Sequence, residues 1–215
     1  MSDKFEIHTD DYAFWHHYFD LDRNYKSIRA LIKDDETLLS ASEYGKGIHI
    51  LNQDPWETLC SFIISQCNNI PRIKKIINSL CEKFGKQINE TTFAFPNADD
   101  LAFLKPQDLD FLHAGYRAEY ILNAATAVST GALDINYIKT LDTNSARNEL
   151  LKLKGVGNKV ADCTLLFGFN RLDCFPVDVW VNRALTEFYN GKMPNINKDY
   201  AGLMQQYLFY YIRKK

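Results

Sequence analysis

The sequence predicts an all-α protein, and three features of its pattern carry that prediction. Apolar and aromatic residues recur at helical spacing along most of the 215 residues. No segment shows the alternation of apolar and polar residues that is typical of a half-buried strand. Asn, Asp and Pro stand before several periodic segments and Gly stands after them, as is usual at helix starts and ends. No internal repeat or low-complexity segment interrupts this order.

The individual helices follow from these boundary signals. Asp54 and Pro55 supply a cap and a first helical position for a mostly apolar helix, which we expect to be central and buried. Gly85 ends the next helix, and caps near Asn97 and Pro106 begin two short ones. In chain order, the expected helices cover residues 10–19, 22–32, 35–44, 56–65, 70–84, two short segments between 96 and 112, 116–129, 142–153, 158–169, 179–189 and 198–212.

Two glycines that bracket a small apolar residue, Gly155-Val156-Gly157, interrupt the helical pattern and predict a tight turn between two helices. The backbone amides at the start of the second helix have no intrahelical partner, so this turn suits a phosphate group. Lys159 lies in the first helical turn after the hairpin, and Asp178 is expected to cap the following helix. The unprotonated amine of a lysine at this position could act as a nucleophile toward carbon.

The stretches LKGVGNKVADC, at 153–163, and FPVDVWV, at 175–181, resemble the helix-hairpin-helix, Gly-Pro-Asp superfamily of DNA base-excision glycosylases. Within it the chain is similar to the 8-oxoguanine DNA glycosylases. A hairpin alone would be weak evidence, because many non-catalytic DNA-binding proteins have one. The hairpin with its lysine and a Pro-Val-Asp at this spacing is specific. The resemblance implies that Lys159 is the nucleophile and Asp178 the catalytic carboxylate.

The resemblance also implies a domain organisation. Residues 54–171 would form a six-helix subdomain that ends in the hairpin. Residues 10–53 and 172–215 would form a second helical subdomain. The active site would lie in the cleft between the two. Family members of the 8-oxoguanine type carry an additional N-terminal β-rich domain. We expect this chain to lack it and to start near the end of that domain, either as a fragment or as a natural short form.

Polar residues separate two helices between Ser65 and Arg72, and from spacing alone this segment is a capped turn. The resemblance implies a loop that enters the duplex, with Asn68 and Asn69 beside the gap left by the flipped base and Arg72 reading the orphaned cytosine. Cys67 stands where the family usually has the Asn that fills this gap, and Asn68 could take that place with a small shift.

A second segment, Gly115-Tyr116-Arg117, is an ordinary helix start by spacing alone. The resemblance implies that Tyr116 is a wedge that unstacks a base step and that Arg117 is a second reader of the cytosine. An aromatic wedge beside a cation suits this task, and arginine supplies the forked donors.

An enzyme that acts on a base within a duplex extrudes it into a pocket. The resemblance implies that Cys163 and Phe209 stack on the two faces of the base and that Gln205 bonds its pairing edge. Without the resemblance, Cys163 and Phe209 would be read as core residues, although Gln205 and Phe209 share one helix face.

The activity implied is that of a bifunctional DNA N-glycosylase and abasic-site lyase, which excises 8-oxoguanine, preferably opposite cytosine, and cuts the strand by β-elimination through a Lys159 Schiff base. No cofactor and no catalytic metal are implied, although a structural cation could lie at the carbonyls of Leu151, Leu153 and Val156. The alternatives are a glycosylase–lyase for another oxidised base and a non-catalytic helix-hairpin-helix module.

Composition agrees with a globular protein but gives no bulk sign of a nucleic-acid partner, since the net charge is −2. We expect a monomer that binds double-stranded DNA and no membrane, located in the cytoplasm (nucleoid) or nucleus, since no targeting signal is visible. The cysteines are scattered and odd in number, so we expect reduced thiols and no iron–sulfur cluster. They are Cys60, Cys67, Cys81, Cys163 and Cys174.

Overall fold

A computed structural model describes residues 6–214, and in this range the chain is helical. The predicted all-α class is confirmed: the described residues contain no β-strand, and Gln87 and Phe93 form only an isolated antiparallel bridge. No helix in the same range is both long and apolar enough to cross a membrane. The elements are α1 (Tyr12–Tyr18), α2 (Tyr25–Arg29), α3 (Glu36–Tyr44), α4 (Pro55–Ser65), α5 (Ile70–Phe84), α6 (Ala98–Leu101), η1 (Pro106–Leu112), α7 (Tyr116–Ser129), α8 (Ile135–Thr140), α9 (Thr143–Leu151), α10 (Asn158–Gly168), α11 (Val179–Tyr189), η2 (Lys198–Tyr200) and α12 (Ala201–Ile212).

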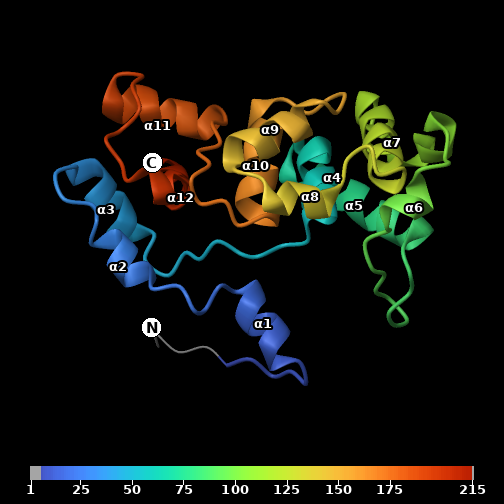
Figure 1. The fold of residues 1–215 in the computed structure, drawn as a ribbon, viewed down its shortest axis with the longest axis horizontal. Coiled ribbons are helices and arrows are strands. Elements are labelled where there is room, and N and C mark those ends of the chain that lie inside the picture. The colour runs from blue at the N-terminus through green and yellow to red at the C-terminus, as the bar shows by residue number, and fades with distance from the viewer. Residues whose placement is uncertain (1–5, 215) are drawn as a thin grey trace. The chain divides into compact units, whose positions relative to one another are not determined.

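The chain divides into two compact units, each with its own core. Unit 1 consists of Met1–Gln53 and Asn170–Lys215, and unit 2 consists of Asp54–Phe169. Unit 2 therefore holds the continuous middle of the chain, from α4 to α10, and unit 1 holds its two ends (Figure 1).

Unit 2 is built around α4, which packs against α10, α7 and α5. Asp54 caps α4 by accepting the amide of Glu57 at 2.8 Å, and Pro55 occupies the first turn, as the sequence predicts. Apolar residues on several sides of α4, among them Leu59, Ile63 and Ile64, are buried, which confirms that this helix is central. The two helices that flank the Gly155–Gly157 turn are α9 and α10, and they pack against each other.

Unit 1 is built around α12, which packs against α3 and α11. The core of the unit includes Tyr207 of α12, which is fully buried, and Leu38 of α3. A polar cluster lies near α2. Asp20 is buried, and its carboxylate accepts hydrogen bonds from Arg23 and from the hydroxyl of Tyr25, the latter at 2.7 Å. The hydroxyl of Tyr25 in turn accepts the amide of Ile50 at 2.9 Å.

The helices at 70–84, 116–129 and 179–189 have the predicted bounds. Residues 130–141, for which no helix is predicted, contain α8, so the expected order is wrong there. The side chain of Asp134 caps α8 by accepting the amides of Asn136 and Tyr137. The helix has six residues and buries Ile138, so it is too short to display a helical period in the sequence.

Other boundaries differ by a few residues at the ends. The helix predicted over 22–32 covers only Tyr25–Arg29, because the side chain of Asn24 caps it late by accepting the amide of Ser27. The last predicted helix begins as the 3₁₀ turn η2 and becomes α-helical at Ala201. Such ends are set by caps and by local hydrogen bonds rather than by periodicity.

Candidate functional site

The helical hairpin leaves the first amides of α10 without a side-chain cap. The turn closes when the amide of Val156 donates to the carbonyl of Leu153 at 3.1 Å. Gly157 is the N-cap residue of α10, and no side chain accepts from the amides of the first turn. Because these amides point out of the helix with the positive end of its dipole, the turn can bind an anion.

Contacts from two other segments of unit 2 hold the hairpin in place. Gly155 has φ +86°, and a Cβ atom here would lie 2.1 Å from the ring of Tyr120, so only glycine fits between this turn and α7. The ammonium of Lys154 pairs with Glu119 at 2.6 Å. The side-chain amide of Gln66 donates to the carbonyl of Gly155 at 3.0 Å. The hairpin is thus anchored to α7 and to the loop between α4 and α5.

The loop between α4 and α5 is held by Arg117 of α7. Arg117 is only 5% exposed, and its guanidinium donates to the carbonyls of Gln66, Cys67 and Ala114. Hydrogen bonds from a charged donor are among the stronger ones in proteins. Through Gln66, the same loop reaches Gly155, so α7, the loop and the hairpin form one connected structure.

The polar residues of this loop keep their predicted local roles. Asn69 caps α5 by accepting the amide of Arg72 at 3.0 Å, and Asn68 donates to the carbonyl of Ile64 at 3.1 Å. Arg72 is exposed and donates to the carbonyl of His113 at 2.7 Å. The capped turn predicted from spacing is confirmed, and Arg72 and Arg117 connect it to the segment that precedes α7.

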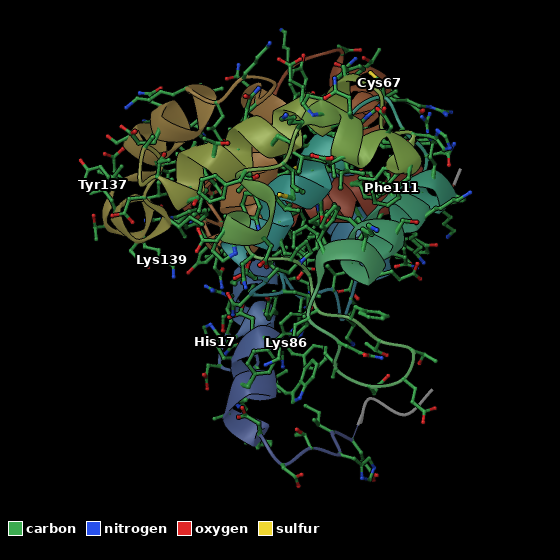
Figure 2. All side chains as sticks on the ribbon, turned by 90° about the vertical axis from the view of Figure 1, so that its right-hand side faces the viewer. His17, Cys67, Lys86, Phe111, Tyr137 and Lys139 are labelled. Atoms are coloured by element: carbon green, nitrogen blue, oxygen red, sulfur yellow. The ribbon has the colours of Figure 1, made fainter. Side chains whose placement is uncertain are left out.

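Cys67 and Tyr116 project from the same region of unit 2. Cys67 is exposed and has φ +46°, a left-handed conformation in which Asn is more common than Cys. Figure 2 shows Cys67 and Tyr137 at opposite sides of the view. Tyr116, the first residue of α7, is 48% exposed, and the guanidinium of Arg117 lies 4.6 Å from the centroid of its ring. An exposed ring backed by a cation and a polar loop is suited to enter a base stack.

Lys159 lies in the first turn of α10, half-buried against an aromatic pair. Its Nζ atom is 4.7 Å from the ring centroid of Phe62, which stacks on Phe167 with centroids 5.7 Å apart. Cys163 follows one helical turn later and is buried. The aromatic face restricts the amine to a defined position, next to the uncapped amides of the hairpin.

Asp178, Gln205 and Phe209 belong to unit 1. Asp178 is half-buried and caps α11, as predicted: its Oδ1 atom accepts the amide of Val181 at 2.8 Å. Its Oδ2 atom has no hydrogen-bond partner among residues 6–214. Gln205 is buried in α12 and accepts from the side chain of Gln206 at 2.6 Å. Phe209 is half-buried one turn further along α12. The two proposed catalytic residues thus come from different units, Lys159 from unit 2 and Asp178 from unit 1.

Three residues that support this arrangement are not among the predicted site residues: Gln66, Glu119 and Tyr120. The sequence contains a sign of one of them, since Tyr116 and Tyr120 are four residues apart on α7 and their rings lie 5.4 Å apart. Nothing in the sequence indicates that the amide of Gln66 reaches residue 155, because the two are 89 positions apart.

The residues described give no sign of a metal-binding cluster. No group of three or more His, Cys, Asp or Glu side chains in residues 6–214 is arranged to hold a metal ion. None of the five cysteines, all of which the structure describes, forms a disulfide. The carbonyl of Leu153 accepts the hairpin hydrogen bond from Val156, and a cation at the carbonyls of Leu151, Leu153 and Val156 stays a prediction.

Two family models match this chain in succession. One, described as 8-oxoguanine DNA glycosylase, N-terminal domain, matches residues 2–59. The other, described as HhH-GPD superfamily base excision DNA repair protein, matches residues 60–204. The described part of the first segment, residues 6–59, contains helices and no strand.

Individual relatives agree with these matches. The chain is 35% identical over 192 residues to an N-glycosylase/DNA lyase of Saccharomyces cerevisiae, covering 80% of this chain and 50% of that protein. It is 30% identical over 214 residues to a probable N-glycosylase/DNA lyase of Methanothermobacter thermautotrophicus, covering 84% of this chain and 68% of the relative. The chain therefore spans half the length of the yeast relative and about two thirds of the archaeal one.

A solved structure shows the same fold. The 8-oxoguanine glycosylase/lyase of Clostridium acetobutylicum, in complex with double-stranded DNA containing cytosine opposite 8-oxoguanine, superposes with a TM-score of 0.88 at 38% identity. The superposition covers 97% of this chain and 77% of that one. With an uncapped hairpin, a lysine in its second helix and the matches above, the chain belongs to the HhH-GPD superfamily of base-excision DNA repair proteins and, within it, to the 8-oxoguanine DNA glycosylase family.

Proposed function

We propose that this protein excises 8-oxoguanine from double-stranded DNA and then cleaves the resulting abasic strand. The observation that carries the proposal is the position of Lys159, half-buried over Phe62 in the first turn after the hairpin. The names of the relatives support both activities, since one is an N-glycosylase/DNA lyase and another a probable N-glycosylase/DNA lyase. The cytosine opposite 8-oxoguanine in the DNA bound by the Clostridium protein supports a preference for that pairing.

The reaction begins at the anomeric carbon of the damaged nucleotide. The unprotonated amine of Lys159 forms a bond to C1′ as the bond between C1′ and the base breaks, and the base leaves with a proton. The sugar ring then opens to a Schiff base with Lys159. Loss of a proton from C2′ breaks the bond between C3′ and its oxygen, so the strand is cut on the 3′ side of the sugar.

Asp178 supplies a negative charge for the cationic sugar that develops in the first step. Its Oδ1 atom is engaged in the α11 cap, which fixes the orientation of the carboxylate, while Oδ2 stays available. A charge that is already oriented before the reaction stabilises the transition state without reorganisation. No step requires a cofactor.

The other predicted residues divide between the DNA strands. We propose that Cys163, Gln205 and Phe209 receive the flipped base. On the opposite strand, Tyr116 enters the stack, Asn68 and Asn69 lie beside the gap, and Arg72 reads the orphaned cytosine. Arg117, whose donors are directed at backbone carbonyls, contributes by holding the loop that carries the asparagines. The hairpin amides from residue 157 onward hold a backbone phosphate.

Borohydride trapping tests the proposal directly, because it reduces the Schiff base to a stable covalent adduct. The duplexes would contain 8-oxoguanine opposite each of the four bases, with an abasic duplex alongside. We expect an adduct on every 8-oxoguanine duplex, and the amount of adduct should be greatest when the opposite base is cytosine. Adduct on the abasic duplex alone would overturn the 8-oxoguanine assignment while keeping the lyase, and no adduct on any duplex would overturn the enzymatic assignment.

Two substitutions sharpen the test. Lys159→Gln removes the amine and should abolish adduct, excision and strand cleavage while leaving duplex binding in place. Lys139→Gln is the matched control, because this lysine lies on α8, on the opposite side of the view from Cys67 (Figure 2), and should react like the parent. Adduct formation by Lys159→Gln would exclude Lys159 as the nucleophile.

A further inference from the structure

Unit 1 carries a cluster of two aromatic rings and two guanidinium groups, which we call the Trp180 platform: Trp180, Arg183, Phe209 and Arg213. The Cζ atom of Arg213 lies 5.2 Å from the ring centroid of Phe209 and 5.9 Å from that of Trp180. The Cζ atom of Arg183 lies 5.8 Å from the same Trp180 ring. One indole is therefore flanked by two permanent positive charges.

Helix geometry accounts for this grouping. Trp180 and Arg183 are three residues apart on α11, and Phe209 and Arg213 are four residues apart across the end of α12, so each pair shares one helix face. The two helices pack against each other, which brings the faces together. The apolar stems of the arginines can then cover the rings while the charged ends stay in water.

Among residues 6–214, the donors of the platform are largely unused. Trp180 is 40% exposed, and both arginines are exposed. In the part of the chain that the structure describes, Arg213 pairs with no carboxylate. Arg183 reaches Glu187 only at 3.9 Å, the outer limit of an ion pair. A guanidinium packed against a ring still presents N–H groups to an acceptor, and a phosphate oxygen matches their fork.

The chain itself places the platform beside two proposed site residues. Trp180 follows Asp178 by two residues in the first turn of α11, and Phe209 belongs to the platform. If Asp178 acts on the sugar and Phe209 on the base, the anion nearest to this face is a phosphodiester of the strand that carries the damaged nucleotide. A local cationic site is also needed, because the net charge of −2 provides no general attraction to DNA.

We propose that Arg183 and Arg213, held on Trp180, bind a backbone phosphate of the damaged strand. This inference rests on the proposed function for the identity of the strand, but not for the phosphate contact itself. The site differs from the hairpin, which belongs to unit 2 and binds through backbone amides. Unit 1 thereby contributes to the affinity for DNA and not only to the chemistry.

The test is the salt dependence of binding, measured by fluorescence anisotropy on a duplex with a reduced abasic site that cannot be cleaved. The full chain is compared with Arg213→Met and Arg183→Met, which keep an apolar stem and lose the charge. The slope of log K against log salt is negative, and each lost phosphate contact reduces its magnitude by about 0.9. From 50 to 200 mM salt, the parent should therefore lose about 3.5-fold more affinity than either variant.

Two further variants separate a phosphate contact from other effects. Arg213→Lys keeps the charge but not the fork, so it should restore the slope with weaker binding. Lys192→Met removes an exposed cation of unit 1 outside the platform, and its slope should equal that of the parent. Slopes of Arg213→Met and Arg183→Met that equal that of the parent would overturn the proposal.

The outcome is distinguishable from failure of the proposed function. If the variants form the trapped adduct normally and their salt slopes equal that of the parent, the phosphate site on the platform is refuted and the proposed enzymatic activity stands. If the slopes of the variants are reduced but the parent forms no adduct on any duplex, the phosphate site stands and the proposed enzymatic activity is refuted.

Discussion

Removal of the Arg117 guanidinium provides the sharpest test of how α7, the loop between α4 and α5 and the hairpin are held together. The variant Arg117→Met keeps a long apolar side chain and removes all donors. In the parent, those donors serve the carbonyls of Gln66, Cys67 and Ala114, and the residue is 5% exposed. The loss of the guanidinium therefore leaves the carbonyls of Gln66 and Cys67 without this donor, whereas the carbonyl of Ala114 still accepts the backbone amide of residue 117.

The expected loss of stability can be estimated from these contacts. A hydrogen bond with a charged partner contributes about 1.5–3 kcal/mol. Water can reach the exposed loop around Cys67 and replace part of the interaction, so the contributions do not add in full. We expect Arg117→Met to lower the free energy of unfolding by about 2–4 kcal/mol. Arg72→Met is the matched control: Arg72 is exposed, with one hydrogen bond to His113, and its loss should lower stability by no more than about 1 kcal/mol.

Urea denaturation followed by circular dichroism measures the stability, and single-turnover excision opposite each of the four bases measures the consequence. Because Arg117 acts through the loop, its loss should slow excision opposite all four bases by a similar factor. Loss of Arg72 should slow excision mainly opposite cytosine. If Arg117→Met unfolds at the same urea concentration as the parent and loses only the preference for cytosine, the structural role argued for Arg117 is refuted.

Three further predictions concern single residues. Gly155→Ala should destabilise the hairpin by more than about 1 kcal/mol and weaken DNA binding, because the new Cβ would collide with Tyr120. Gly157→Ala, whose Cβ would have nothing within 4 Å, should unfold in urea like the parent. If Gly155→Ala has the same urea midpoint as the parent, the contact between Gly155 and Tyr120 does not limit this position. Asp178→Asn should keep the α11 cap and the stability of the protein but lower the rate of single-turnover excision about 100-fold or more. Asp178→Ala should also lower the free energy of unfolding, measured with heat or urea, by about 1 kcal/mol. An Asn variant that excises at the parent's rate would exclude the carboxylate from the chemistry. Burial and the hydrogen bond to a buried aspartate raise the pKa of Tyr25. The contribution of Tyr25 to stability is therefore full below the ordinary phenol pKa of about 10 and falls as the pH rises above it. The difference in unfolding free energy between the parent and Tyr25→Phe should shrink above pH 10, and a constant difference would argue against this linkage.

Local sequence signals determined much of the helix order. Asp54 with Pro55, Asn69 and Asp178 begin helices where predicted, because a cap is made by a side chain and an amide two or three residues away. The same locality explains the error at α8, which is short and buries Ile138, leaving no periodic pattern to detect. The Gly155–Gly157 turn and Lys159 were also visible in the sequence, since the turn chemistry and the family motif occupy consecutive positions.

Tertiary structure decided how these parts support one another. Three contacts join residues that are far apart in the chain. Arg117 donates to the carbonyls of Gln66 and Cys67, Gln66 donates to the carbonyl of Gly155, and Phe62 packs against Lys159. The Trp180 platform depends in the same way on the packing of α11 against α12. The sequence by itself determined which residue types and helices were present. Only folding decided which donors are used within residues 6–214, because a guanidinium or amide gives its hydrogen bonds to whichever acceptors the packed chain brings within reach.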